Sequence, residues 1–259
     1  MLNRRTFLRR CAVCSGSFMG FMSGELMAAP NPSGVGGYDY RLPAFPKGSR
    51  LLFLGDSITD MKWGRNQRDR NHYLGHSYVY LIASRLGVEM PEAKLGFFNR
   101  GISGNKVGDL KKRWQKDAID MKPDLLSILI GVNDVSQSRG KNVPLDQWEA
   151  DYRSILDSSA SANAKLRLVL LDPFVLRSGR LRAEGPWTFW RGEVDKLRGI
   201  VARLARDYDA VHIKTQDVFD TAAKAVSPAH WIWDGVHPLP QGHELIARNW
   251  LQQVSARWK

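Results

Sequence analysis

Short apolar runs alternate with longer amphipathic stretches along most of the chain. The runs are of strand length, and several are apolar at every position instead of at every second one, which is typical of strands buried on both faces of a parallel sheet. The stretches between them repeat apolar residues at helical spacing. The pattern therefore predicts an α/β fold, a parallel five-stranded sheet with helices on both faces. The predicted strands are Leu51–Leu54, Gly96–Asn99, Leu125–Ile130, Leu166–Leu171 and Ala210–Ile213, and the predicted helices are Leu74–Leu86, Asn105–Ala118, Pro144–Ser159, a helix ending near Asp207 and His243–Val254.

The residues before the first predicted strand divide into an export segment and a linker, and the rest of the chain forms one domain. Arg4-Arg5-Thr6-Phe7-Leu8 is typical of a twin-arginine signal, and the small residues Ala28-Ala29 provide a cleavage point. We therefore expect residues 1–29 to be a removed export signal, residues 30–49 to be a linker that wraps onto the domain, and residues 50–259 to be the domain itself. A periplasmic or secreted location follows from that expectation.

Composition narrows the range of partners. The net charge of +12 favours solubility or loose attraction to acidic polymers, but no zinc-finger spacing, basic helix or aromatic RNA-binding motif accompanies it, so we expect no nucleic-acid partner. No apolar stretch of about 18 residues occurs, so no stable membrane insertion is expected of the mature protein. Both cysteines, Cys11 and Cys14, fall in the export segment, which leaves the domain without thiol chemistry. Association into a homo-oligomer is compatible with this composition.

Residues suited to acyl transfer follow several predicted strands. Ser57 follows the first strand, Gly101 the second and Asn133 the third, and parallel strands bring their carboxyl ends to one edge of the sheet. Asp234 and His237, three residues apart, provide a carboxylate and an imidazole. Ser57 can be the nucleophile, His237 its base and Asp234 the group that orients the base. The backbone N–H groups of Ser57 and Gly101 and the side-chain amide of Asn133 can form the oxyanion hole.

Each of these residues also has an ordinary structural explanation. A serine or asparagine after a strand is often a helix cap or turn former, a glycine there is often a turn, and a histidine before proline is often a surface residue. The order in which the residues follow the strands favours catalysis over these separate explanations.

Other motifs compete weakly with this interpretation. Ser103 and Lys106 match Ser-x-x-Lys, but the other β-lactamase motifs are missing, and Gly-x-Ser-x-Gly does not occur. The histidines lack the carboxylate or cysteine spacing of a zinc site, and His72 and His76 are explained by a polar loop, so we expect neither a catalytic metal nor a cofactor.

The four blocks Gly55-Asp56-Ser57-Ile58, Gly101, Gly131-Val132-Asn133-Asp134 and Asp234-Gly235-Val236-His237 resemble the conserved motifs of the SGNH, or GDSL, hydrolase family. The runs GDSITD, NRGISGNKVGDLKKRW, LSILIGVNDV and WDGVHPLPQGHELIAR are similar to its bacterial acetylxylan-esterase branch. The resemblance covers roughly residues 50–250. It implies a three-layer α/β/α flavodoxin-like fold, with Ser57, Gly101 and Asn133 as oxyanion donors and Asp234 and His237 completing the site. The chain departs from the family pattern at the arginine-rich loop 61–73.

These features together predict a secreted serine esterase that removes acetyl groups from plant-polysaccharide sugars such as acetylated xylan. Trp63, Trp231 and Trp233 lie close in sequence to the catalytic blocks and are candidates for stacking on a sugar, although each can equally fill the core. Two alternatives stay open. One is a lipase, lysophospholipase or thioesterase of the same fold, and the other is an inactive carbohydrate-binding protein.

Overall fold

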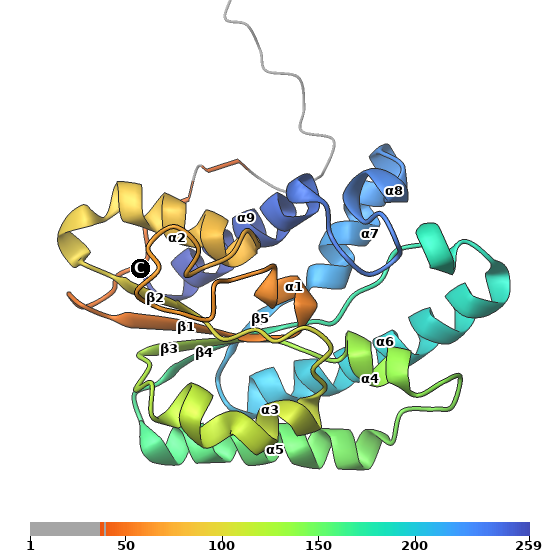
Figure 1. Ribbon diagram of the computed structural model, residues 1–259, viewed down its shortest axis with the longest axis horizontal. Helices are drawn as coiled ribbons and strands as arrows, with labels where there is room; N and C mark the ends of the chain where they lie inside the picture. The colour runs from red at the N-terminus through yellow and green to blue at the C-terminus, as the bar shows by residue number, and fades with distance from the viewer. Residues whose placement is uncertain (1–36, 39) are drawn as a thin grey trace, which may run out of the picture. The chain divides into compact units, whose positions relative to one another are not determined.

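Five parallel strands form one sheet in the computed structural model, which describes residues 37–38 and 40–259 (Figure 1). The strand order is β2-β1-β3-β4-β5, so the order reverses at β1. This is the flavodoxin-like arrangement, in which ligands bind where the direction of the strand order changes. The predicted α/β fold is confirmed. The strands are β1 Arg50–Gly55, β2 Gly96–Asn99, β3 Leu125–Leu129, β4 Arg167–Leu171 and β5 Val211–Ile213.

Helices cover both faces of the sheet (Figure 1). The helices α3, α5 and α6 form the lower layer in this view, and α2, α7 and α9 form the upper layer. The helices are α1 Ser57–Asp60, α2 Tyr78–Glu89, α3 Val107–Trp114, α4 Val132–Gln137, α5 Leu145–Ala162, α6 Glu184–Asp207, α7 Thr215–Ala225, α8 Pro228–Trp231 and α9 Pro240–Arg257; a π-helical turn, Gln115–Ile119, follows α3, and 3-10 turns form at Pro91–Ala93 and Gly179–Leu181.

The core lies between these layers and the sheet. Every side chain from Leu51 to Leu54 in β1 is fully buried, which explains the uninterrupted apolar run in the sequence. On the upper face, the ring of Phe53 packs against Tyr78 of α2 at 6.2 Å and against Trp250 of α9 at 5.6 Å. The indole N–H of Trp250 donates to Ser127 Oγ of β3 at 3.1 Å, so the one polar group of this side chain is satisfied inside the core.

Several predicted boundaries shift because of helix caps. The helix predicted from Leu74 begins at Tyr78, since Ser77 Oγ accepts the N–H of Val79 at 3.2 Å and forms the N-cap. Pro186 lies in the first turn of α6, where proline costs no hydrogen bond. The sequence prediction also missed α4, α7 and α8.

The described part of the predicted linker packs on the domain. Ala44 N donates to the carbonyl of Trp258 at 2.7 Å, and Arg167 Nη1 donates to the carbonyl of Ala44 at 2.6 Å. The predicted export segment, residues 1–29, lies outside the described residues. In residues 37–38 and 40–259, no helix combines the length and the hydropathy needed to cross a bilayer.

Candidate active site

A tight turn from β1 into α1 places Ser57 at the carboxyl edge of the sheet. Gly55 ends the strand, and a Cβ at this position would lie 2.4 Å from the carbonyl oxygen of Leu129 and from Thr59 Oγ1, so only glycine fits. Asp56 then caps the helix, since its Oδ1 accepts the N–H of Ile58 at 2.9 Å. Ser57 is therefore the first helical residue, with a partly exposed side chain.

Ser57, His237 and Asp234 form a continuous hydrogen-bonded chain. Ser57 Oγ lies 2.9 Å from His237 Nε2, and His237 Nδ1 lies 2.7 Å from Asp234 Oδ2. Because a carboxylate only accepts, Nδ1 carries the proton, and Nε2 is free to accept the hydroxyl proton of Ser57. Burial alone would raise the pKa of Asp234, but hydrogen bonds from the His237 side chain and from the N–H groups of His237 and Val236 lower it to about 2. Asp234 is thus an anion over the whole working range of a histidine base.

The loop that carries Asp234 and His237 is tightly held. Gly235 has φ +95°, and its carbonyl accepts the N–H of Leu176 at 3.0 Å. Gly179 packs so closely on this loop that a Cβ there would lie 2.4 Å from the Cα of Asp234. These contacts fix the loop to the segment after β4, and this arrangement brings a residue near the C-terminus next to the serine after β1.

The structure places Asn133 near the predicted oxyanion site but gives Gly101 a different role. Asn133 is the second residue of α4, the helix that follows β3, and its Nδ2 donates to the carbonyl of Asn105 at 3.1 Å, which leaves a second amide hydrogen available. The N–H of Gly101, in contrast, donates to Asn99 Oδ1 at 2.8 Å in a buried position. A Cβ at Gly101 would lie 2.4 Å from the backbone N of Asp60. Gly101 therefore lets the loop pass against α1, and the prediction that its N–H is an oxyanion donor is wrong.

Gly104 has the free N–H group that Gly101 lacks. It is exposed, has φ +83°, and its N–H has no hydrogen-bond partner within the described part of the chain. Its carbonyl accepts Nε2 of Gln137 at 2.8 Å, and Asn133 contacts the next residue, so Gly104 lies in the same loop that Asn133 holds. The sequence signal that could have found it is the Ser-Gly-Asn turn at residues 103–105, where a glycine supplies a left-handed backbone.

Two of the three predicted sugar-binding tryptophans are structural. Trp63 is 7% exposed, and its Nε1 donates to the carbonyl of Gly101 at 2.8 Å. Trp231 is 6% exposed, and its Nε1 donates to the carbonyl of Ala222 at 3.2 Å. Neither can present a ring face to a sugar, so both predictions are wrong. Trp233, 59% exposed and adjacent to Asp234, is available for stacking.

Titratable groups are buried close to the site. Burial raises the pKa of the Asp56 carboxyl to about 7, although the N–H of Ile58 opposes this, and burial likewise raises the pKa of Asp134 to about 7. Burial lowers the pKa of His243 to about 3, and its Nδ1 accepts the N–H of Tyr78 at 3.3 Å, so this imidazole is neutral. These groups carry no charge in mildly acidic solution and do not compete with His237 as a base.

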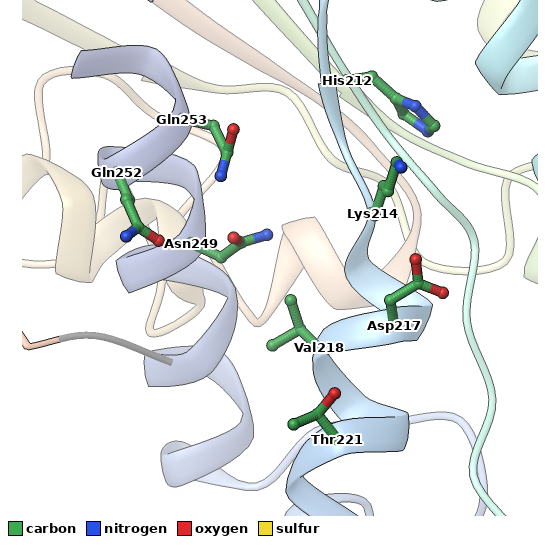
Figure 2. Close-up of a pocket in the computed structure, with 8 residues that line it drawn as sticks. All are labelled: His212, Lys214, Asp217, Val218, Thr221, Asn249, Gln252 and Gln253. Atoms are coloured by element: carbon green, nitrogen blue, oxygen red, sulfur yellow. The ribbon is translucent and has the colours of Figure 1, made fainter. Parts of the chain in front are cut away.

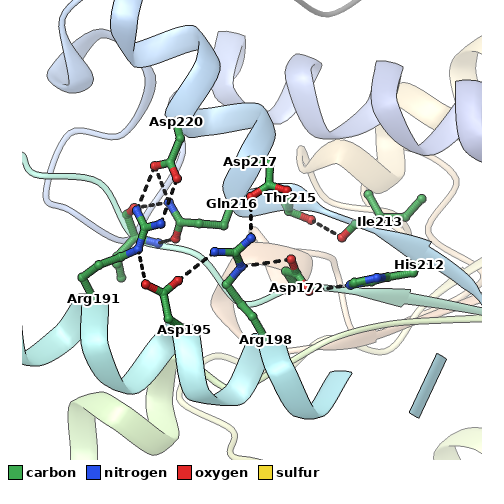
Figure 3. A network of polar contacts seen from close by, with 11 residues as sticks. Asp172, Arg191, Asp195, Arg198, His212, Ile213, Thr215, Gln216, Asp217 and Asp220 are labelled. Carbon is green, nitrogen blue, oxygen red and sulfur yellow. Dashed lines mark hydrogen bonds and ion pairs between the residues drawn. The ribbon is translucent and has the colours of Figure 1, made fainter. Parts of the chain in front are cut away.

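A second histidine–aspartate pair joins the carboxyl end of β4 to β5, the last strand of the sheet. His212 Nε2 is 2.7 Å from Asp172 Oδ1, and Asp172 Oδ2 accepts Nε of Arg198 at 3.1 Å (Figure 3). Arg198 continues to Asp195 and Asp217, so this network ties α6, β5 and α7 together. No serine or cysteine contacts His212 among the described residues, so the pair lacks a nucleophile.

A cavity of about 380 Å³ adjoins His212 between α7 and α9 (Figure 2). Polar side chains dominate its lining, which consists of His212, Lys214, Asp217, Val218, Thr221, Asn249, Gln252 and Gln253. Within residues 37–38 and 40–259, the cavity included, the structure shows no group of three or more His, Cys, Asp or Glu side chains arranged to hold a metal ion.

The flavodoxin-like sheet and the Ser–His–Asp array are an arrangement suited to ester hydrolysis. The chain matches the model of the GDSL-like lipase/acylhydrolase family over residues 53–245, and it belongs to that family. It is thus an esterase of the GDSL type.

Individual relatives agree with this assignment. An acetylxylan esterase from Geobacillus stearothermophilus is 35% identical in an alignment of 219 residues that covers 82% of this chain and 96% of that protein. A crystal structure of that enzyme, 35% identical, aligns with a TM-score of 0.70 over 81% of this chain and 95% of the other. A crystal structure from Parabacteroides merdae, described as a GDSL-like lipase, is 32% identical and aligns with a TM-score of 0.76 over 83% of this chain and 99% of the other.

Proposed function

We propose that this protein is a carbohydrate acetylesterase that removes acetyl groups from plant-polysaccharide sugars such as acetylated xylan. The observation that carries the chemistry is the chain of contacts from Ser57 Oγ through His237 to Asp234, at 2.9 Å and 2.7 Å. The substrate class is supported by the 35% identity to an acetylxylan esterase that this chain matches over 96% of its length.

In the proposed mechanism, Ser57 Oγ attacks the ester carbonyl while His237 Nε2 accepts its proton. Asp234 keeps the imidazole in the required tautomer and stabilises the imidazolium that forms. The N–H groups of Ser57 and Gly104 and the side chain of Asn133 donate to the developing oxyanion. His237 then protonates the departing sugar oxygen, and water, activated by the same imidazole, hydrolyses the acetyl-serine ester.

Trp233 is the candidate for binding the sugar. Its ring is exposed and directly precedes the catalytic aspartate, so a pyranose with apolar C–H faces can stack on it while its ester reaches Ser57. Trp233→Ala is expected to raise KM for an acetylated xylooligosaccharide and to leave KM for p-nitrophenyl acetate, which lacks the sugar, near the wild-type value.

The proposed function is tested by measuring acetate release from acetylated xylan, acetylated pectin and acetylated monosaccharides. The wild-type protein should release acetate from at least one of these, and Ser57→Ala should lose activity by several orders of magnitude. Ser57→Ala that retains more than about a tenth of wild-type turnover would show that Ser57 is not the nucleophile. A wild-type protein that hydrolyses only long-chain p-nitrophenyl esters would instead indicate a lipase.

We also propose export through the twin-arginine route, on the basis of Arg4-Arg5-Thr6-Phe7-Leu8 and the small residues Ala28-Ala29. Replacing both arginines by lysine keeps the charge but removes the recognised pair, so the precursor should accumulate in the cytoplasm. Cell fractionation checks this, and mature protein of the variant outside the cytoplasm would exclude the route.

A further inference from the structure

The arginine-rich loop 61–73, where the chain departs from the family pattern, reaches the active-site loop through Arg65. Arg65 Nη2 donates to Asp60 Oδ2 at 2.6 Å, and its Nη1 donates to the carbonyl of Gly101 at 2.9 Å. One guanidinium therefore joins the end of α1 to the start of the loop 101–105. The backbone of Arg65 has φ +56°, a conformation that a non-glycine residue adopts rarely. Such a conformation persists where surrounding contacts hold it.

Asp60 is the centre of this arrangement. It is the last residue of α1, whose first residue is Ser57, and it is 2% exposed. Besides Arg65, Asp60 Oδ2 accepts the backbone N–H of Ser103 at 2.9 Å and its hydroxyl at 2.8 Å. The residue directly before Gly104 is thus fixed to the helix that carries the nucleophile.

The Gly101 carbonyl receives a second donor, the indole N–H of Trp63 at 2.8 Å. The guanidinium of Arg65 lies 4.9 Å from the Trp63 ring centroid, and that of Arg100 lies 5.0 Å from it. Trp63 supports Arg65 through a cation–π contact, and both side chains hold the same carbonyl. The buried tryptophan that was predicted to bind sugar is therefore part of this support.

The positive charge of Arg65 stabilises the ionised form of Asp60. Burial of Asp60 would raise its pKa, but the hydrogen bonds from Arg65 and Ser103 outweigh this and lower the pKa, so the carboxylate is ionised. Asp60 Oδ1 has no hydrogen-bond partner in the described part of the chain, so the anion depends on the donors at Oδ2. Without Arg65, this buried negative charge would keep only the neutral donors of Ser103, three residues from Ser57, where a second negative charge develops during ester hydrolysis.

We propose that Arg65 is a positioning residue for the oxyanion hole. It acts through Asp60 and Gly101 to hold the loop that carries the Gly104 N–H at a fixed distance from Ser57. Arg65 is half exposed, as expected of a surface arginine, but its partner is buried. The ion pair between Arg65 and Asp60 should therefore contribute more than an ordinary surface ion pair does. The proposal rests on the serine mechanism proposed above.

The test compares Arg65→Ala, Arg65→Lys and the control Arg68→Ala in the hydrolysis of p-nitrophenyl acetate. Arg68 is an exposed residue of the same loop whose side chain has no ion pair among the described residues. Misplacing an oxyanion donor by about 1 Å costs on the order of 10²-fold in rate, so Arg65→Ala should lower kcat by about 10- to 100-fold. KM should change by less than about threefold, because the interaction is made in the transition state. Lysine keeps one donor and the charge, and it should restore part of the rate.

Two further readouts separate positioning from a loss of structure. The acidic limb of the pH profile of kcat/KM should not move, because the Ser57–His237–Asp234 contacts are intact in Arg65→Ala. Added methylguanidinium should raise the kcat of Arg65→Ala and leave that of Arg68→Ala unchanged. An Arg65→Ala enzyme that stays within about threefold of the wild-type kcat overturns the proposal, as does a variant whose whole loss appears in KM.

Ser103→Ala keeps the test decisive if Arg65→Ala fails to fold. It removes the hydroxyl bond to Asp60 and leaves the backbone bond in place, so the protein should still fold and its kcat should fall by about 3- to 10-fold. A wild-type kcat for Ser103→Ala overturns the proposal. Failure of the serine mechanism is distinguishable, because it would appear as activity retained by Ser57→Ala.

Discussion

Replacing Asp56 by asparagine should make the protein more stable near neutral pH and flatten the pH dependence of its stability. Asp56 is 1% exposed, and its Oδ2 has no hydrogen-bond partner within residues 37–38 and 40–259. Burial raises the pKa of its carboxyl from 3.8 to about 7. Asparagine keeps the oxygen that accepts the N–H of Ile58 and is itself a favourable N-cap, so the variant removes the ionisation and keeps the cap.

The sign and size of the pH dependence that Asp56 gives to the free energy of unfolding follow from proton linkage. Between pH 4 and 7 the folded protein holds a proton on Asp56 that the unfolded chain has lost, so the free energy of unfolding of the wild type falls as pH rises through this window. Each pKa unit corresponds to about 1.4 kcal/mol. Ionisation of Asp56 should therefore lower the free energy of unfolding of the wild type by about 2–3 kcal/mol between pH 5 and pH 7. For a domain of this size that is roughly 5–10 °C in melting temperature.

The assay is chemical denaturation of wild type and Asp56→Asn at pH 5, 6, 7 and 8, with Asp146→Asn as the control. Asp146 is an exposed residue in the first turn of α5 whose side chain makes no hydrogen bond within the described part of the chain, so its replacement should leave the pH dependence unchanged. The difference in stability between Asp56→Asn and wild type should grow by about 2–3 kcal/mol from pH 5 to pH 7 and then level off. A difference that stays constant over this range would refute the argument that Asp56 is buried as the neutral acid.

Three further predictions concern the catalytic residues, the glycine turns and the acyl group. His237→Ala should lower kcat for p-nitrophenyl acetate more than Asp234→Asn, by about 10⁶-fold against about 10⁴-fold, because the orienting group is partly replaceable and the base is not; equal and small losses would place the base elsewhere. Gly101→Ala should unfold at a lower temperature than Gly104→Ala in a thermal melt, because its Cβ would lie 2.4 Å from a backbone atom of Asp60, whereas a Cβ at Gly104 meets nothing within 4 Å; equal melting temperatures would contradict this. The kcat/KM of p-nitrophenyl esters should fall from acetyl to octanoyl, because the catalytic segments are poor in branched apolar residues that could bind each added CH₂ at about 0.8 kcal/mol, and a rising series would favour a lipase.

The sequence was sufficient to predict the strands of the sheet, because a strand that is buried on both faces is apolar at every position. Each predicted strand agrees with the structure within one residue, since a run such as Leu125–Ile130 can be accommodated only where both faces are covered. Placing Ser57 and Asn133 at one edge needed only the rule that parallel strands end together. The three-residue spacing of Asp234 and His237 was similarly enough to predict their mutual contact, because it is made within one turn of chain.

The tertiary structure alone decided which groups are free to act. Gly101 and Gly104 are three residues apart and look alike in sequence, but a side chain from β2, Asn99, occupies the N–H of one and leaves the other open. Trp63 is buried, and its partners include the Gly101 carbonyl and the Arg100 guanidinium from another segment, which no periodicity within residues 61–73 encodes. Hydrophobic pattern reports whether a residue is buried in a regular element, whereas the availability of a donor or a ring face depends on partners brought together through space.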